Sequence, residues 1–185
     1  MTEVFIVGAA RTAIGALMGT LKAVPAHKLG SIAIKEALTR AGVKPEQIDE
    51  VMMGNVLMAG QGQGPGRQAA LGAGIPESVP AWAINQLCGS GLKTIALAVD
   101  AIKAGEAQCV VAGGMESMST APHVVNLRNG TALGDVTFKD STVLDGLTDV
   151  FSGEHMGMTA EWLADELKIT REEMDKFAAE SQKRV

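Results

Sequence analysis

One short stretch constrains the fold more than any other: Asn85 to Leu92, which reads Asn-Gln-Leu-Cys-Gly-Ser-Gly-Leu. The residues before it, Ala81–Ile84, are apolar and follow Pro80, a pattern typical of a buried strand. The residues after it, Leu92 to Ile102, carry apolar side chains nearly all round a helical wheel, which predicts a buried helix. Cys88 is therefore predicted to lie where a strand turns sharply into the N-terminus of a central helix.

That position favours nucleophilic chemistry at Cys88. The first turn of a helix has N–H groups without a partner and a partial positive charge, so a thiolate there is stabilised. Gly89 and Gly91 permit a tight turn and let a substrate carbonyl approach the backbone closely. A nucleophile beside anion-stabilising N–H groups is what acyl transfer requires. The alternative is a small buried cysteine at a strand–helix junction, and the spacing alone does not decide between the two.

Alternating strand and helix patterns on either side of this stretch predict an α/β fold. The predicted strands are Val4–Val7, part of Ile48–Met58, Ala81–Ile84 and Cys109–Gly113. The predicted helices between them are His27–Ala41, with Gly42 as its stop signal, Arg67–Ala73 and Leu92–Ile102. We expect Val4–Val7 to be buried on both faces and Cys109 to be a core residue. This order predicts a mostly parallel sheet with helices on both faces. Ligands of such sheets bind beyond the carboxyl ends of the strands, where Cys88 falls.

Composition and spacing exclude several classes of function. A net charge of −5 argues against nucleic acid and anionic membranes as partners, because both select clustered Lys and Arg. No apolar run approaches the ~20 residues of a spanning helix, and two cysteines form no disulfide framework. We therefore expect a cytoplasmic protein without a metal site. The glycine-rich stretch Gly60–Gly66 lacks the spacing of nucleotide-binding loops, which predicts a flexible connection.

The cysteine stretch resembles the nucleophile motif of the thiolase family, N-x-x-C-G-S-G. Four further stretches resemble motifs of that family in the same order along the chain: Val7–Gly15, Gly64–Ala70, Val110–Ser119 and His155–Glu161. The similarity is greatest to the biosynthetic acetoacetyl-CoA type, the acetyl-CoA C-acetyltransferases. Only the first half of such a protein is covered. The family's histidine in G-H-P, asparagine in N-E-A-F and second cysteine in C-x-G have no counterpart here.

The resemblance implies a domain organisation as well as a fold. Thiolases have five layers, α-β-α-β-α, and the C-terminal half of that arrangement is missing here. Residues 1–119 are predicted to form the core with the nucleophile, and residues 120–157 an inserted loop domain that covers coenzyme A. Residues 158–185 are predicted to be helical: Thr170 and Glu173 form a capping box, and no stop signal follows before Val185. We expect the chain to be cut inside that helix.

The resemblance also implies roles for individual residues. Cys88 is the expected nucleophile, and its own N–H the expected oxyanion donor. Leu147, His155 and Met156 match positions that line the pantetheine and acyl pocket. The substrates implied are acetyl-CoA and acetoacetyl-CoA, with coenzyme A as a thioester substrate and no covalently bound cofactor. The family is also homo-oligomeric.

Two classes of function stay open. The first is an acyltransferase that condenses two acetyl-CoA molecules in the complete protein, while this chain alone is nearly inactive for lack of the C-terminal bases. A broader chain length, as in 3-ketoacyl-CoA thiolases, is a variant of that hypothesis. The second is a non-catalytic or half-site assembly module that needs the missing half, whose absence would leave the outer apolar face of the Leu92–Ile102 helix wet.

Overall fold

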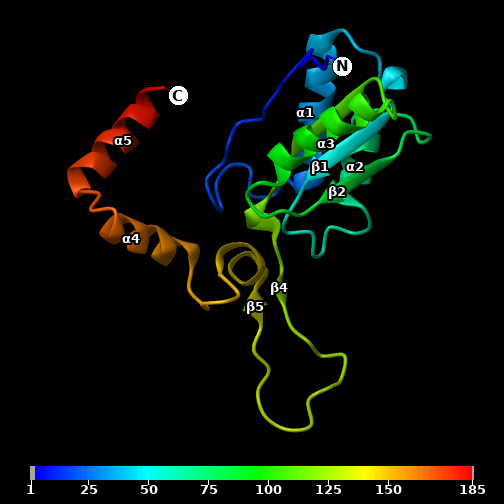
Figure 1. Cartoon of the computed structure of the whole chain (residues 1–185). Helices are drawn as coiled ribbons and strands as arrows, with labels where there is room; N and C mark the ends of the chain where they lie inside the picture. Colours follow the sequence, from blue (N-terminus) through cyan, green and yellow to red (C-terminus); the bar gives the residue numbers. More distant parts are fainter. Residues whose placement is uncertain (1–2, 185) are drawn as a thin grey trace. The chain divides into compact units, whose positions relative to one another are not determined.

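Three parallel strands form the centre of the fold, in the order β2-β1-β3 (Figure 1). They are β1 (Glu50–Gly54), β2 (Ala81–Ile84) and β3 (Val110–Gly114). The structure is a computed structural model that describes residues 3–184. Met1 and Thr2 of the predicted domain 1–119 and Val185 of the predicted segment 158–185 lie outside the described residues. The predicted parallel α/β sheet is confirmed.

Helices cover both faces of this sheet. On one side, α1 (Ala26–Ala41) and α2 (Pro65–Gly72) pack against each other, and Val51 and Met53 of β1 belong to the same buried cluster. Because side chains alternate along a strand, Met52 points to the other face, which α3 (Ser90–Ala104) covers. The three predicted helices therefore exist, with ends that differ by at most two residues from prediction. Gly42 ends α1 in the left-handed conformation, with φ 65°, as its sequence position predicted.

The predicted strand at Val4–Val7 is wrong. The segment has extended but unpaired backbone, and Ile6 is 81% exposed. It runs along a cleft of about 390 Å³ that β3 and α3 line on the other side. An apolar run shows a preference for β structure but does not supply the partner strand on which burial depends.

The prediction of a buried helix is wrong for the outer side of α3, which is exposed as the second hypothesis expected. Its buried residues are Ser90, Thr94 and Ala98, spaced four apart along one stripe. Leu92, on another side of the helix, is 74% exposed. A sheet covers only one side of a helix, and no other described element covers the outer side of α3. Its apolar residues are therefore left at the surface.

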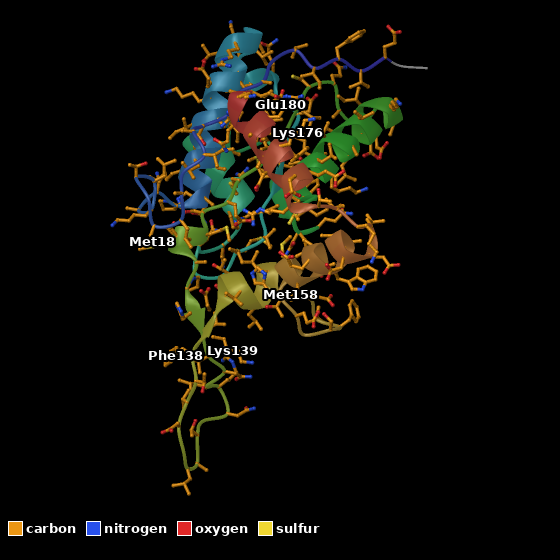
Figure 2. All side chains as sticks on the ribbon, turned by 90° about the vertical axis from the view of Figure 1, so that its left-hand side faces the viewer. Met18, Phe138, Lys139, Met158, Lys176 and Glu180 are labelled. Carbon is orange, nitrogen blue, oxygen red and sulfur yellow. The ribbon has the colours of Figure 1, made fainter. Side chains whose placement is uncertain are left out.

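Beyond β3 the first unit of the chain ends in a long hairpin. A 3-10 turn (η2, Met118–Thr120) leads into β4 (His123–Val124), which pairs antiparallel with β5 (Lys139–Asp140). The loop between them runs away from the sheet, and Phe138 lies on this arm (Figure 2). A π-helix, η3 (Thr142–Leu147), follows.

The chain falls into two compact units, the first ending at Gly146 and the second beginning at Leu147. The second contains α4 (Met156–Glu166) and α5 (Arg171–Lys183). The capping box is confirmed: the Glu173 N–H donates to Thr170 Oγ1 at 3.2 Å, and the Thr170 N–H donates to Glu173 Oε2 at 2.8 Å. The predicted boundaries at residues 119 and 157 divide the chain by expected role, the nucleophile core before 119 and the loop domain over coenzyme A up to 157. They stay predictions. No helix within residues 3–184 combines the length and apolarity needed to cross a bilayer.

Glycines let α3 sit directly on the ends of two strands. A Cβ on Gly54, the last residue of β1, would lie 2.5 Å from the backbone nitrogen of Gly91 and 2.6 Å from the carbonyl carbon of Ser90. A Cβ on Gly114, the last residue of β3, would lie 3.2 Å from Gly91 Cα. The first turn of α3 therefore packs backbone to backbone against the carboxyl ends of β1 and β3, and nothing larger than glycine fits at position 54.

Replacing Gly54 tests this packing. We expect Gly54→Ala to lower the free energy of unfolding by about 1–3 kcal/mol, because the methyl group meets backbone atoms that have no rotamer to change. Gly113→Ala is the matched control in the neighbouring strand, since its Cβ would meet only Met53 Sδ at 3.9 Å. Urea denaturation followed by circular dichroism measures both. Equal stability of the two variants would contradict the proposed contact.

Candidate active site

Cys88 lies on a tight elbow between β2 and α3, as the sequence predicted. β2 ends at Ile84, Gly89 is the N-cap of α3, and the helix begins at Ser90. The residue before the cysteine, Leu87, has φ 48° in the left-handed region, which is uncommon outside glycine. The elbow thus carries local backbone strain, and it presents the Cys88 side chain at the surface.

Two polar side chains hold the elbow in this conformation. Ser90 is 4% exposed; its Oγ accepts from the Gln86 N–H at 2.8 Å and donates to the Leu87 carbonyl at 2.6 Å. Asn85 Oδ1 accepts from the Leu87 N–H at 2.9 Å. Ser90 thus bonds the peptide groups before and after the strained residue, and Asn85 bonds the N–H of that residue. Such over-determination is what allows a left-handed leucine to persist.

The backbone N–H of Cys88 takes no part in these hydrogen bonds, whereas two N–H groups after it do. The Gly89 N–H donates to the Gln86 carbonyl at 3.1 Å, and the Ser90 N–H to the Leu87 carbonyl at 3.0 Å. The sulfur and an N–H of the same residue therefore stand together at the positive end of α3. That pairing suits a nucleophile whose attack on a carbonyl produces a tetrahedral intermediate, because the negative oxygen of the intermediate needs a hydrogen-bond donor. The predicted support of a substrate by Gly89 and Gly91 stays a prediction, and Gly91 also contacts Gly114 as described above.

The predicted pocket residues belong to the second unit, where they lie together. Leu147 ends η3, and the next residue, Thr148, forms an isolated antiparallel bridge with His155. His155 is the N-cap of α4, and its Nδ1 accepts from the Gly157 N–H at 3.0 Å. Met156 follows as the first residue of that helix and is half exposed. Their predicted contacts with coenzyme A stay predictions.

A cavity of about 370 Å³ opens at the carboxyl end of β3. The loop before α1 forms one wall and the segment Gly114–Ser119 the other. The Met18 N–H donates to Ser119 Oγ at 2.9 Å and so joins these two walls. Met18 is labelled in Figure 2. This cavity lies on the strand ends where ligands of parallel sheets bind.

Sequence reasoning missed three residues that hold the site: Gly54, Asn55 and Glu116. Asn55 is 1% exposed and bonds Glu116 through its amide group. One signal was available, because each of them stands at or just beyond the end of an apolar strand. A glycine that ends such a run commonly marks a close backbone approach. Nothing in the sequence indicated which strand ends would meet.

Comparison with known proteins agrees with this geometry. A family model described as "Thiolase, N-terminal domain" matches residues 4–185. The acetyl-CoA acetyltransferase of Cupriavidus necator is 56% identical over 186 aligned positions, which cover all of this chain and 47% of that protein. The cytosolic acetyl-CoA acetyltransferase of Rattus norvegicus is 54% identical, covering 98% of this chain and 46% of its own. The chain belongs to the thiolase family. It spans about half the length of the thiolases it matches.

The two cysteines of this thiolase domain should react at different rates. Cys88 is exposed, whereas Cys109 is half-buried at the opposite end of the sheet, just before β3. Burial raises the pKa of the Cys109 thiol, and the nearby Asp49 carboxylate raises it further. Less of Cys109 is therefore thiolate near neutral pH, and the thiolate is the reactive form.

We expect limiting iodoacetamide at neutral pH to modify Cys88 before Cys109. Intact mass counts the modifications, and peptide mapping assigns them. Denatured protein is the control, since both thiols are then solvated and should react alike. Faster modification of Cys109 in the folded protein would contradict the prediction.

Proposed function

We propose that Cys88 is the nucleophile of an acyl transfer from acetyl-CoA. The observation that carries this proposal is the elbow, on which an exposed sulfur and the Cys88 N–H stand before the first turn of α3. The similar proteins of Cupriavidus necator and Rattus norvegicus are named acetyl-CoA acetyltransferases, which supports acetyl-CoA as the donor. A 3-ketoacyl-CoA thiolase of broader chain length is the variant that these names favour less.

The first step is transfer of the acetyl group to the protein. The Cys88 thiolate attacks the acetyl carbonyl carbon, and the oxyanion that forms accepts a hydrogen bond from the Cys88 N–H. The bond from that carbon to the sulfur of coenzyme A then breaks, and coenzyme A leaves as a thiolate and takes up a proton. The protein is left with an acetyl thioester on Cys88.

The second step joins two acetyl groups. A second acetyl-CoA gives up a proton from its α-carbon to a base, and the carbanion attacks the carbonyl of acetyl-Cys88. The Cys88 thiolate leaves, and the product is acetoacetyl-CoA; thiolysis is the same sequence in reverse. Leu147, His155 and Met156 shape the acyl pocket in this proposal, and none of them is assigned a proton transfer.

The base for the second step is expected from the half of the thiolase length that this chain does not span. Loss of a general base costs about 10²–10⁴-fold in rate. Loss of an opposing oxyanion donor costs about a further 10²–10³-fold. The 185-residue chain should therefore acylate slowly and turn over hardly at all.

Incubation with acetyl-CoA tests the proposal. We expect intact mass to rise by one acetyl group, carried by Cys88, and a coupled assay to detect almost no acetoacetyl-CoA. Cys88→Ser should not be acetylated, and Cys109→Ser should behave like the unchanged chain. Acetylation of the Cys88→Ser variant to the same extent would overturn the assignment of the nucleophile.

A second candidate function is assembly with the part of the thiolase length that this chain does not span. It is favoured by the apolar residues at the surface of α3, where Leu92 is 74% and Ile95 39% exposed. Apolar surface of this kind drives association. We propose that the remaining half of the thiolase length, in the same or a separate chain, covers this side of α3. Homo-oligomerisation of the complete protein stays a prediction, as does a cytoplasmic location, which the cytosolic relatives of rat and mouse support.

Without that half the chain should self-associate. We expect light scattering to find dimers or larger species and a hydrophobic dye to bind. Leu92→Glu should reduce both signals, because it places a charge in the exposed apolar surface. Asp100→Glu is a control on the same helix that keeps charge and exposure. A monomer that binds no dye would count against the assembly proposal.

A further inference from the structure

Glu116 joins the ends of two neighbouring strands. It lies two residues beyond β3, and its carboxylate accepts three hydrogen bonds from the loop that follows β1. The Asn55 amide donates to Oε1 at 2.7 Å, the Val56 N–H to Oε2 at 2.8 Å and the Leu57 N–H to Oε1 at 3.2 Å. All three donors are consecutive residues, so one side chain fixes the course of that loop.

The carboxyl group of Glu116 is held between burial and hydrogen bonding. The Glu116 side chain is half-buried, and burial raises the pKa of its carboxyl group against the opposing effect of the hydrogen bonds from Val56, Leu57 and Asn55. A carboxyl group with a raised pKa stabilises the fold less when ionised than when protonated. Burial thus disfavours the charged form of this carboxyl group, while three hydrogen bonds from the Asn55–Leu57 loop favour it. Such a group at the ligand end of a sheet is a candidate for a role in function.

Asn55 connects Glu116 to the elbow. Its side-chain amide donates to Glu116 Oε1 and to the Met115 carbonyl at 3.3 Å, while its backbone N–H donates to the Ile84 carbonyl at 3.0 Å. Ile84 is the last residue of β2, directly before the elbow that carries Cys88. A chain of two hydrogen bonds therefore leads from the carboxylate to the point where the elbow begins.

The carboxyl end of β1 also contacts the first turn of α3, which follows the elbow. The Met115 N–H donates to the Gly54 carbonyl at 2.9 Å, and Gly54 is the residue on which the first turn of α3 rests. Gln61 secures Asn55 from the other side, because its Nε2 donates to Asn55 Oδ1 at 3.1 Å and to the Leu57 carbonyl at 2.7 Å. Of the three residues that Glu116 bonds, Asn55 is the one that continues to the elbow, through its hydrogen bond to Ile84.

We propose that Glu116 is a positioning residue for Cys88: its carboxylate fixes Asn55, and Asn55 fixes the strand end from which the elbow starts. This inference rests on Cys88 being the reactive group of the proposed function. The hydrogen bonds of Glu116 go to Asn55, Val56 and Leu57 and not to Cys88, and we assign it no contact with the reacting atoms. Its effect passes through the backbone of Asn55 and Ile84.

The test is the rate of Cys88 alkylation by iodoacetamide in Glu116→Gln. A carboxamide has one acceptor oxygen, so its NH₂ group must face at least one of the three donors, and the loop shifts. We expect the Cys88 rate to fall about threefold to tenfold, since a displacement of about 1 Å at a reacting group can cost up to about a hundredfold. The rate at Cys109 should not change, because it lies at the other end of the sheet.

Three comparisons separate positioning from loss of structure. Glu106→Gln removes the same charge at an exposed position and should leave both cysteines unchanged. Asn55→Ala removes the link but keeps both backbone donors to Glu116, and it should slow Cys88 as much as Glu116→Gln does. The double variant should be no slower than either single one, because both changes break the same connection.

Each outcome decides the matter. A Cys88 in the unchanged chain that reacts no faster than free cysteine overturns the proposed function and this inference together. A fast Cys88 that stays fast in Glu116→Gln or in Asn55→Ala overturns the positioning role alone. Faster alkylation of Cys109 in Glu116→Gln also overturns the positioning role, because it would show that the variant unfolds. The role is likewise overturned if the double variant slows Cys88 by the product of the two single effects. Slowing confined to Cys88, equal in both variants and non-additive, supports the role.

Discussion

The site depends on a contact between backbones. Gly54 and Gly114 end two neighbouring strands, and Gly91 lies in the first turn of α3 directly above them. With no side chain at these positions, the positive end of the helix comes as close to the sheet as two main chains can. The elbow that carries Cys88 must then bridge from β2 to α3 within five residues, Asn85 to Gly89. The tight turn and the left-handed Leu87 are consequences of that short bridge.

Polar groups keep the bridge in one conformation. Ser90 and Asn85 bond the elbow from within, and Asn55 bonds the residue from which it starts. None of these hydrogen bonds adds apolar burial. Asn55 also bonds the half-buried carboxyl group of Glu116, whose pKa is raised by burial. The carboxyl ends of the strands therefore carry a network whose value lies in geometry. The opposite end of the sheet shows the contrast, since Cys109 is half-buried there with a raised pKa that suits an inert thiol.

The sequence predicted what local chemistry determines. Strand β2 was predicted to the residue, Gly42 was predicted as a stop signal and Thr170 as a cap, and the turn at Cys88 follows from glycines between an apolar run and a helical pattern. Contacts that join distant segments could not be predicted. Glu116 meets Asn55 across 61 positions of chain, and Gly54 meets Gly91 only because parallel strands align their ends. A hydrophobic period identifies a face but not the element that will cover it.

The two wrong predictions have one cause. Val4–Val7 was expected to be a buried strand and α3 a buried helix, and both line the same cleft beside β3. In each case the sequence showed correctly that the residues are apolar, but the prediction that they are buried was wrong. A side chain is buried only where a second surface covers it, and residues 3–184 supply no such surface for Ile6 or Leu92. The relatives are about twice as long as this chain. The apolar residues of α3 and of Val4–Val7 therefore exceed what residues 3–184 bury, and this excess is the observation behind the assembly proposal.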